Sequence, residues 1–513
     1  MFDVRFSTFP FFIVRVGTAL RKRLNVSRTD ARRAGKRGAG APVLMAPPAP
    51  SPLLWRSDFD KFVVTANFQR RGWQRWHANH DFDWNVYWAN VHTTREIFAP
   101  ENGIRLGEHQ RINHFPNHYE LTRKDLLVKN VKRYRKDLER EAIRAGEDPS
   151  VASRNASSAV DFLPATFALP GEYALFADAF RRETEASPTA DDDDAATRVP
   201  ARSRATNGRG LASRVASPRE KRRKRPTWIM KPTGKAQGKG IFLINSLQQT
   251  RRWASASYAG GTPNAVGAGS NVRGEESYVV SRYVDDPLLV GGKKFDLRLY
   301  VVVTSFRPLR AFVSRLGFAR FCAAKYVPSQ STRGDLSDHF AHLTNVAVQK
   351  NNAEYNAAHG GKWSLRNLRL FLESARGADA TARLFAELDA VILKSLRAVQ
   401  NVMHDDAHCF ELYGYDMLID DSLKPWLIEV NASPSLSATT DDDGDVKLAV
   451  IRDALAAAIP EGFPGASTVD ERAVVVGSME LLVDDAMDAA ARERARERGD
   501  RGAGRSARER RGR

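Results

Sequence analysis

The chain has 513 residues, of which 42% are hydrophobic, so it is long enough for two or three domains with a substantial core. Its formal net charge of +18 first suggests an acidic polymer as partner. Most of this charge lies in three segments, however: +9 in residues 1–57, +4 in residues 183–225 and +6 in residues 492–513. The rest of the chain carries a net charge of −1. We expect no nucleic acid as partner, because no recognition motif accompanies this charge, and no membrane span, because no apolar run approaches 18 residues.

Residues 1–57 are rich in arginine and proline and poor in acidic residues, which predicts a basic, disordered N-terminal arm. An organelle transit peptide and a wrongly assigned start remain alternatives. Residues 58–182 have a globular texture and are assigned to an N-terminal subdomain and the start of a central one. An amphipathic helix around Phe62, Ala66 and Phe68 is followed by a strand over residues 82–88.

A long charged helix follows the segment RINHFPNHYELTRKDLLVKN. Its basic residues can share one face, and such a run is usually a solvated helix surface. Those residues are Lys124, Lys129, Lys132, Arg133 and Lys136. A helix over residues 170–182 ends at residues 183–225, whose low complexity predicts a disordered insertion. Its run KRRKR allows a nuclear signal as the alternative to a solvated linker.

Two strands, over residues 228–232 and 241–244, flank a loop that contains Gly234, Gly238 and Gly240. Glycines let backbone N–H groups approach an anion, and Lys231 adds a positive charge, so this hairpin is predicted to cover a phosphate. It is not a Walker A loop, because no GxxxxGK[ST] precedes a helix.

The segment SYVVSRYVDDPLLVGGKKFDLRLYVVV predicts two strands. The first ends in residues 281–284, whose backbone is free to pair with an adenine edge. On the second, Lys294, Asp296 and Arg298 alternate with apolar residues and therefore share one face. Arg320 follows in GFARF.

The sequence FELYGYDMLIDDSLKPWLIEVNASPSL predicts two strands joined by a tight polar turn. Glu429 and Asn431 then point to the same side, and Asp416 on the first strand comes near them. Two carboxylates and an amide oxygen suit Mg²⁺ carrying the phosphates of a nucleotide. The alternative is a solvent-facing strand edge, but carboxylates among buried strands are costly without a cation.

The remaining segments carry no predicted chemistry. Residues 368–403 have apolar residues at helical spacing and are predicted to be core helices, and a further helix follows Lys447. Residues 461–491 are predicted as a helical extension and residues 492–513 as an Arg-rich disordered tail. Cys322 and Cys409 each lie beside a phenylalanine without metal-binding spacing, which predicts buried thiols in a reducing compartment.

The order of Lys231, GKGI, SRYV, KFDLR, GFARF, HLTN, Asp416 and EVN closely resembles the tubulin–tyrosine ligase-like family, over residues 55–460. The segment RINHFPNHYELTRKDLLVKN and HLTNVAVQK are most similar to its member-nine branch of probable tubulin polyglutamylases. The resemblance implies an α/β (α+β) ATP-grasp fold with N-terminal, central and C-terminal subdomains, in which the nucleotide is held between two mixed β-sheet layers. Residues 226–460 would form the catalytic core.

The resemblance also assigns site residues. ATP would contact Lys231, Gln237, Gly238, Lys239, Gly240, Ser281, Arg282, Tyr283, Val284, Lys294, Phe295, Asp296, Thr344 and Asn345. Two Mg²⁺ ions would be held by Asp416, Glu429 and Asn431, and the catalytic residues would be Arg298, Arg320 and Glu429. Free L-glutamate and the acceptor would be held by Gln237, Arg320, Ala347, Lys362 and Lys447, where Ala347 departs from the polar residue of other branches.

The family joins an amino acid to a protein carboxylate through an acyl-phosphate, so the resemblance implies glutamate addition to tubulin C-terminal tails. Glycine or tyrosine addition and a non-catalytic microtubule-associated scaffold are the alternatives, although the intact Asp416, Glu429 and Asn431 set speaks against an inactive protein. The implied partners are tubulin or microtubules and possible accessory subunits. The implied location is the cytoplasm and cytoskeleton, with a cilium or flagellum axoneme or basal body as the specific site.

Overall fold

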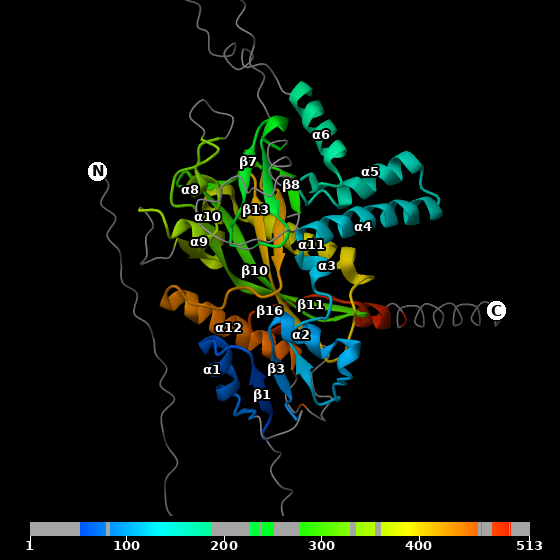
Figure 1. Ribbon diagram of the computed structural model, residues 1–513, viewed down its shortest axis with the longest axis vertical. Coiled ribbons are helices and arrows are strands. Elements are labelled where there is room, and N and C mark those ends of the chain that lie inside the picture. The colour runs from blue at the N-terminus through cyan, green and yellow to red at the C-terminus, as the bar shows by residue number, and fades with distance from the viewer. Residues whose placement is uncertain are drawn as a thin grey trace, which may run out of the picture. The chain divides into compact units, whose positions relative to one another are not determined.

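Figure 1 shows the protein as a computed structural model. The structure describes residues 52–77, 83–186, 226–235, 237–250, 277–328, 335–353, 361–459, 463, 474–491 and 493. The predictions for the N-terminal arm up to residue 51, for residues 187–225 and for the tail from residue 494 lie outside these described residues. The described residues form a mixed α/β structure with several sheets, as expected.

A central eight-stranded sheet carries most of the predicted site. Its main path runs β14-β13-β10-β11-β16-β15, with β9 added to β10 and β12 added to β11. Its two long strands, β10 and β11, pair antiparallel across the short turn at residues 307–308. The strands are β9 (Leu289–Val290), β10 (Lys293–Phe306), β11 (Leu309–Phe321), β12 (Lys362–Ser364), β13 (Glu411–Ile419), β14 (Pro425–Asn431), β15 (Val475–Val476) and β16 (Met479–Asp484).

The two faces of this sheet pack against different helices (Figure 1). One face of β10, with Leu297 and Leu299, packs in a core with α10 (Leu365–Arg376) and α11 (Ala378–Gln400). The other face, with Tyr300 and Val302, packs in a second core with α1 (Phe62–Arg70) and α12 (Asp441–Ala458). The predicted core helices over residues 368–403 are therefore confirmed, although they are two helices, separated at Gly377 with a φ of +90°.

The N-terminal part forms a four-stranded sheet of order β2-β1-β3-β4. Its strands are β1 (Leu54–Ser57), β2 (Gln74–Arg75), β3 (Val86–Trp88) and β4 (Arg111–Ile112), and its short helices are α2 (Val91–Ile97), η1 (Pro100–Asn102) and α3 (Tyr119–Thr122). The prediction of a disordered arm over residues 1–57 is wrong for residues 54–57, because β1 pairs with both β2 and β3 and buries Trp55 in the core. The predicted amphipathic helix is α1, although Phe62 itself is exposed.

A third sheet, of order β5-β8-β6-β7, contains the predicted phosphate-covering hairpin. Its strands are β5 (Thr166–Leu169), β6 (Trp228–Pro232), β7 (Phe242–Ile244) and β8 (Tyr278–Arg282). The sheet packs against α6 (Tyr173–Ala186), where the ring centroids of Phe176 and Trp228 lie 5.2 Å apart. Between the N-terminal and third sheets in the chain come α4 (Lys124–Arg144) and α5 (Pro149–Ala159), and α8 (His339–His342) and α9 (Val346–Gln349) follow β11.

The predicted helical extension over residues 461–491 is wrong for residues 475–484. They form β15 and β16, and β16 extends the central sheet by pairing with β11. Met479 and Leu481 pack in the second core, and Val483 packs in the first, so the strand contributes to both faces of the sheet. Residues 485–491 are helical. None of the helices in the described ranges is both long and apolar enough to cross a membrane.

Candidate active site

The hairpin of β13 and β14 places the predicted metal ligands side by side. Asp420 closes the turn by accepting hydrogen bonds from the backbone N–H groups of Ser422 and Lys424, each at 3.0 Å. Beyond the turn the register shifts by one residue at Ile428, and this shift places Asp416 directly opposite Glu429. The Asn431 amide nitrogen lies 3.4 Å from Asp416 Oδ2, so the predicted juxtaposition of the three residues is confirmed.

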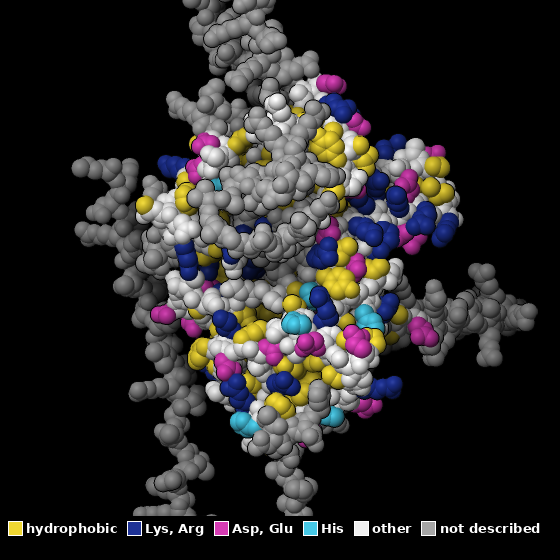
Figure 2. Space-filling model, in the orientation of Figure 1, with side chains coloured by type: hydrophobic (Ala, Val, Ile, Leu, Met, Phe, Trp, Pro, Cys, Tyr) yellow, Lys and Arg dark blue, Asp and Glu magenta, His cyan; other side chains and the backbone are white. Residues whose placement is uncertain are grey.

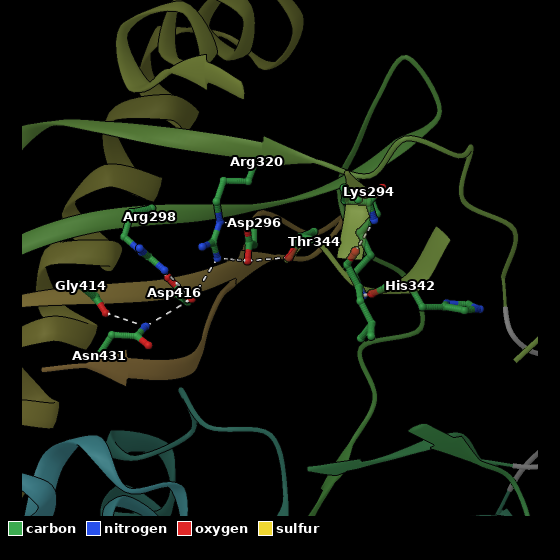
Figure 3. Close-up of polar contacts among 11 residues, drawn as sticks. Lys294, Asp296, Arg298, Arg320, His342, Thr344, Gly414, Asp416 and Asn431 are labelled. Atoms are coloured by element: carbon green, nitrogen blue, oxygen red, sulfur yellow. Dashed lines mark hydrogen bonds and ion pairs between the residues drawn. The ribbon is translucent and has the colours of Figure 1, made fainter. Parts of the chain in front are cut away.

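Two arginines from the long strands converge on Asp416 (Figure 3). Arg298 binds both of its oxygens, at 2.6 and 3.0 Å, and Arg320 binds Oδ2 at 2.9 Å. Arg320 also binds both oxygens of Asp296, and the Thr344 hydroxyl donates to Asp296 at 2.6 Å. Burial favours the neutral acid, but the two guanidiniums outweigh it and hold the pKa of Asp416 well below its ordinary value.

Lys294 comes from the same face of β10 and points to a different part of the site (Figure 3). Its ammonium donates to the Tyr283 hydroxyl at 2.8 Å and to the His342 carbonyl at 3.1 Å. The His342 ring in turn lies 2.9 Å from the same hydroxyl. Burial lowers the pKa of Lys294 to about 8 and lowers the pKa of His342. His342 was not predicted as a site residue, because its role depends on a fold contact that sequence spacing does not reveal.

These groups surround one cavity between the third sheet and the central sheet. Its empty space, open mouth included, is about 1000 Å³. Eleven of the predicted residues line it: Lys231, Ser281, Arg282, Tyr283, Val284, Lys294, Asp296, Thr344, Asn345, Asp416 and Glu429. Most of the other lining side chains are apolar, among them Ile229, Leu343 and Leu418.

Lys231 is a buried cation in the wall of this cavity. Burial lowers its pKa to about 8, against a partial opposing effect of Glu429. The predicted loop with Gln237, Lys239 and Gly240 follows β6 as a turn. Gly238 in that turn has a φ of +79°, and a Cβ there would lie 3.0 Å from Val348 and 3.2 Å from Asn345, so the turn approaches the site closely.

Lys362 and Lys447, predicted to hold the amino acid, meet at a second carboxylate. The Lys362 and Lys447 ammoniums each lie 2.9 Å from an oxygen of buried Asp443. Ala347 is exposed on α9. The predicted contact of Phe295 with the nucleotide is not supported, because its side chain points to the opposite face of β10 and packs in the core against Phe321.

The donor set fits a magnesium ion that shares its ligands with a nucleotide. Mg²⁺ usually takes one or two carboxylates and completes its shell with phosphate and water oxygens. Asp416 and Glu429 would supply the carboxylates, and no group of three or more acidic, histidine or cysteine side chains suited to a metal occurs in the part of the chain that the structure describes. An open two-carboxylate site is thus compatible with this structure, whereas a closed protein cage is not found there.

A family model described as the tubulin-tyrosine ligase family matches residues 103–466, which include all of these side chains. The chain belongs to this family. The resemblance seen in the motifs is therefore confirmed, and the match ends before β15 and β16.

Curated relatives agree with this membership of the tubulin-tyrosine ligase family. The chain is 43% identical over 445 residues to a probable alpha-tubulin polyglutamylase of Tetrahymena thermophila, covering 85% of this chain and 94% of the relative. It is 40% identical over 405 residues to a probable tubulin polyglutamylase of Rattus norvegicus, covering 75% of each chain. A probable tubulin polyglutamylase of Caenorhabditis elegans is 38% identical over 400 residues, with 78% of each chain covered.

Lys124 is a second cavity residue, besides His342, that was missed from the sequence. It lies at the start of α4 and was assigned to a solvated basic face, but its side chain is only 15% exposed and its ammonium lies 3.1 Å from Glu429 Oε2. Lys129 and Lys136 on the same helix are exposed, as predicted. Lys124 differs because it lies one helical turn before Leu127 and Val128, which also line the cavity. Only its contact with Glu429 on β14 identifies it.

Proposed function

We propose that this protein is an ATP-dependent ligase that joins glutamate to tubulin. Membership of the tubulin-tyrosine ligase family supports the ligase, and the relatives named as tubulin polyglutamylases support glutamate and tubulin. The observation that carries the proposal is the position of Asp416, which lies opposite Glu429 and between two arginines in the wall of the cavity. This arrangement suits phosphoryl transfer to a carboxylate.

We assign the architecture to the ATP-grasp fold, with residues 226–460 as its catalytic core. The third sheet and the central sheet would be the two layers that hold the nucleotide, since both contribute walls to the cavity. The adenine would lie against the apolar wall near Tyr283, with the 281–284 backbone along its edge. The phosphates would extend toward Lys231, Lys294 and the turn at Gly238.

Charge neutralisation is the main chemical contribution of these residues. The γ-phosphoryl group of ATP passes to an acceptor carboxylate, and the amine of glutamate then displaces the phosphate from the acyl-phosphate. Arg298 and Arg320 would face the negative charge that builds up on the transferred group, and their guanidiniums are already oriented by Asp416 and Asp296. Mg²⁺, held by Asp416, Glu429 and Asn431, would neutralise the phosphate oxygens.

An acidic tail as acceptor is compatible with the surface of this protein. Figure 2 shows Lys and Arg side chains gathered over α4 and α5, beside the cavity. Tubulin tails are acidic, so electrostatic attraction would favour the encounter. We propose microtubules as the place of action, with the axoneme or basal body of a cilium or flagellum as the specific location and accessory subunits as possible partners.

The test is incubation of the full chain with tubulin, ATP and Mg²⁺, followed by mass spectrometry of the tubulin tails. Parallel reactions contain glutamate, glycine or tyrosine, so that one set of samples identifies both the reaction and its amino acid. We expect mass increments of glutamate only. Mass increments of glycine or tyrosine instead would refute glutamate as the amino acid that the protein adds. The absence of every increment, in protein that still binds ATP, would favour the scaffold.

A further inference from the structure

We propose that Asp443 is a positioning residue that holds Lys362 and Lys447 together as a clamp for a carboxylate of the incoming amino acid. The inference rests on the proposed function, because it concerns the glutamate of that reaction. Asp443 lies in the first turn of α12, whereas Lys362 comes from the short strand β12. The two lysines thus come from elements far apart in the sequence and meet at one side chain.

Asp443 is almost completely buried, with 1% of its surface exposed. Its Oδ2 accepts from the Lys362 ammonium at 2.9 Å and from the Lys447 ammonium at 3.1 Å. The same oxygen accepts from the backbone N–H and the hydroxyl of Thr439, at 2.9 and 3.0 Å. Both ammoniums therefore lie within two hydrogen-bond lengths of each other, which their mutual repulsion would prevent without the intervening carboxylate.

The Lys362 ammonium keeps a hydrogen-bonding position for a ligand. It donates to Asp443 at 2.9 Å and to the Thr439 hydroxyl at 3.0 Å, which uses two of the three N–H donors of an ammonium. The Lys447 ammonium lies within 3.1 Å of both Asp443 oxygens and donates to the Ser437 carbonyl at 2.6 Å. Lys362 can therefore donate to a carboxylate, and the charge of Lys447 beside it adds to the attraction.

The clamp is tied to the reacting centre by a short loop. Asn431 ends β14, and only the loop 432–440 separates it from α12. Ser437 and Thr439 of this loop are the residues that bind the two lysines. Lys362 lies directly opposite Arg320 in the pairing of β12 with β11, which places the clamp beside the arginines around Asp416. A carboxylate held there would lie near the reacting centre.

Asp443 also keeps the clamp charged. Burial lowers the pKa of Lys447, and the neighbouring charge of Lys362 lowers it further, whereas Asp443 opposes both effects. Burial alone would raise the pKa of Asp443, but its hydrogen bonds to the two lysines lower it below its ordinary value. Without Asp443, the Lys362 and Lys447 ammoniums would repel each other with no anion between them. Lys447 would then lose its proton at a lower pH than in the wild type.

The test compares Asp443→Asn with Asp453→Asn in the full chain. Asp453 is a matched control, because it is also buried on α12 and ion-paired, to Arg452 at 2.7 Å, but it contacts none of the clamp residues. Calorimetry measures glutamate binding to protein loaded with Mg²⁺ and a non-hydrolysable ATP analogue. We expect a rise of about tenfold or more in the glutamate Kd for Asp443→Asn only, with the Kd of the ATP analogue unchanged.

Two further measurements separate positioning from a structural role. The weakening of glutamate binding with rising pH should begin at lower pH in Asp443→Asn than in the wild type. If that variant does not fold, Thr439→Val removes hydrogen bonds from Lys362 and Asp443 while keeping both charges, and we expect a severalfold rise in the glutamate Kd alone.

Equal glutamate affinity in the wild type and Asp443→Asn, or equal losses in Asp443→Asn and Asp453→Asn, would overturn the inference. Should Asp443→Asn fail to fold, an unchanged glutamate Kd in Thr439→Val would overturn it. Wild-type protein that binds glutamate but transfers none to tubulin would refute the proposed function instead.

Discussion

The Lys124 ammonium lies 3.1 Å from the Glu429 carboxylate and joins the first turn of α4 to the end of β14. A residue proposed to bind a metal is thus paired with a cation from another part of the fold. When phosphate and Mg²⁺ enter, Glu429 would turn to the metal and Lys124 would be free to contact the phosphate. Lys124 would then contribute to nucleotide binding although it belongs to no nucleotide motif.

We expect Lys124→Met to raise the Kd of the ATP analogue with Mg²⁺ about tenfold, since one cation close to the phosphates is lost. Calorimetry measures this constant. Lys129→Met is the control, because Lys129 is exposed on the same helix outside the cavity lining. Equal nucleotide affinity in the two variants would refute a role for Lys124 in nucleotide binding.

Asp416→Asn and Glu429→Gln should both abolish ligation but differ in stability. Removal of the Asp416 charge leaves Arg298 and Arg320 buried without this partner, and breaking a buried pair costs about 3 to 5 kcal/mol. Glu429 is 22% exposed and has only Lys124 as an ion-pair partner among the described residues, so its substitution should cost at most about 1 kcal/mol. Urea unfolding measures both free energies. Full ligation by Glu429→Gln would refute its metal assignment.

The difference between these residues also shows how far the sequence could predict the site. The turn and the alternation in β14 predicted the hairpin and the approach of Asp416 to Glu429 and Asn431. They did not predict the register shift at Ile428, without which Asp416 would lie opposite Ile428. Lys124 and Asp443 were missed as site residues, since each acts through a contact with an element far along the chain. β16 was misassigned because its residues are also compatible with a helix, and only pairing with β11 selects the strand.

Nucleotide binding should take up protons above about pH 8. Burial lowers the pKa of Lys231 and of Lys294 to about 8, and the phosphates should raise both values by favouring the charged form. Calorimetry in two buffers of different ionisation enthalpy, at about pH 8.5, measures this uptake. Lys231→Met should reduce it, whereas Lys129→Met should not. Proton release by the wild type would contradict the prediction.

The same two lysines affect stability in the protein without nucleotide. Their folded-state pKa values lie below the ordinary value of 10.5, so the unfolded chain binds more protons between about pH 8 and 10.5. The contribution of these lysines to the free energy of unfolding therefore rises with pH in this window, and their burial penalty is fully present below it. The free energy of unfolding of the wild type and of Lys231→Met, measured across this window, gives the contribution of Lys231. A difference between the two proteins that does not change with pH would refute the lowered pKa.

Gly238→Ala and Gly234→Ala test the close approach of the turn after β6. Gly238 has a φ of +79°, and its added Cβ would lie 3.0 Å from Val348 and 3.2 Å from Asn345, whereas a Cβ on Gly234 meets nothing within 4 Å. An alanine at Gly238 therefore either strains the backbone by about 1 to 2 kcal/mol or moves the turn away from Asn345. We expect about tenfold weaker binding of the ATP analogue in Gly238→Ala only. Similar affinity in both variants would show that the turn does not contact the nucleotide, because Gly238 differs from Gly234 both in its positive φ and in its closeness to Asn345.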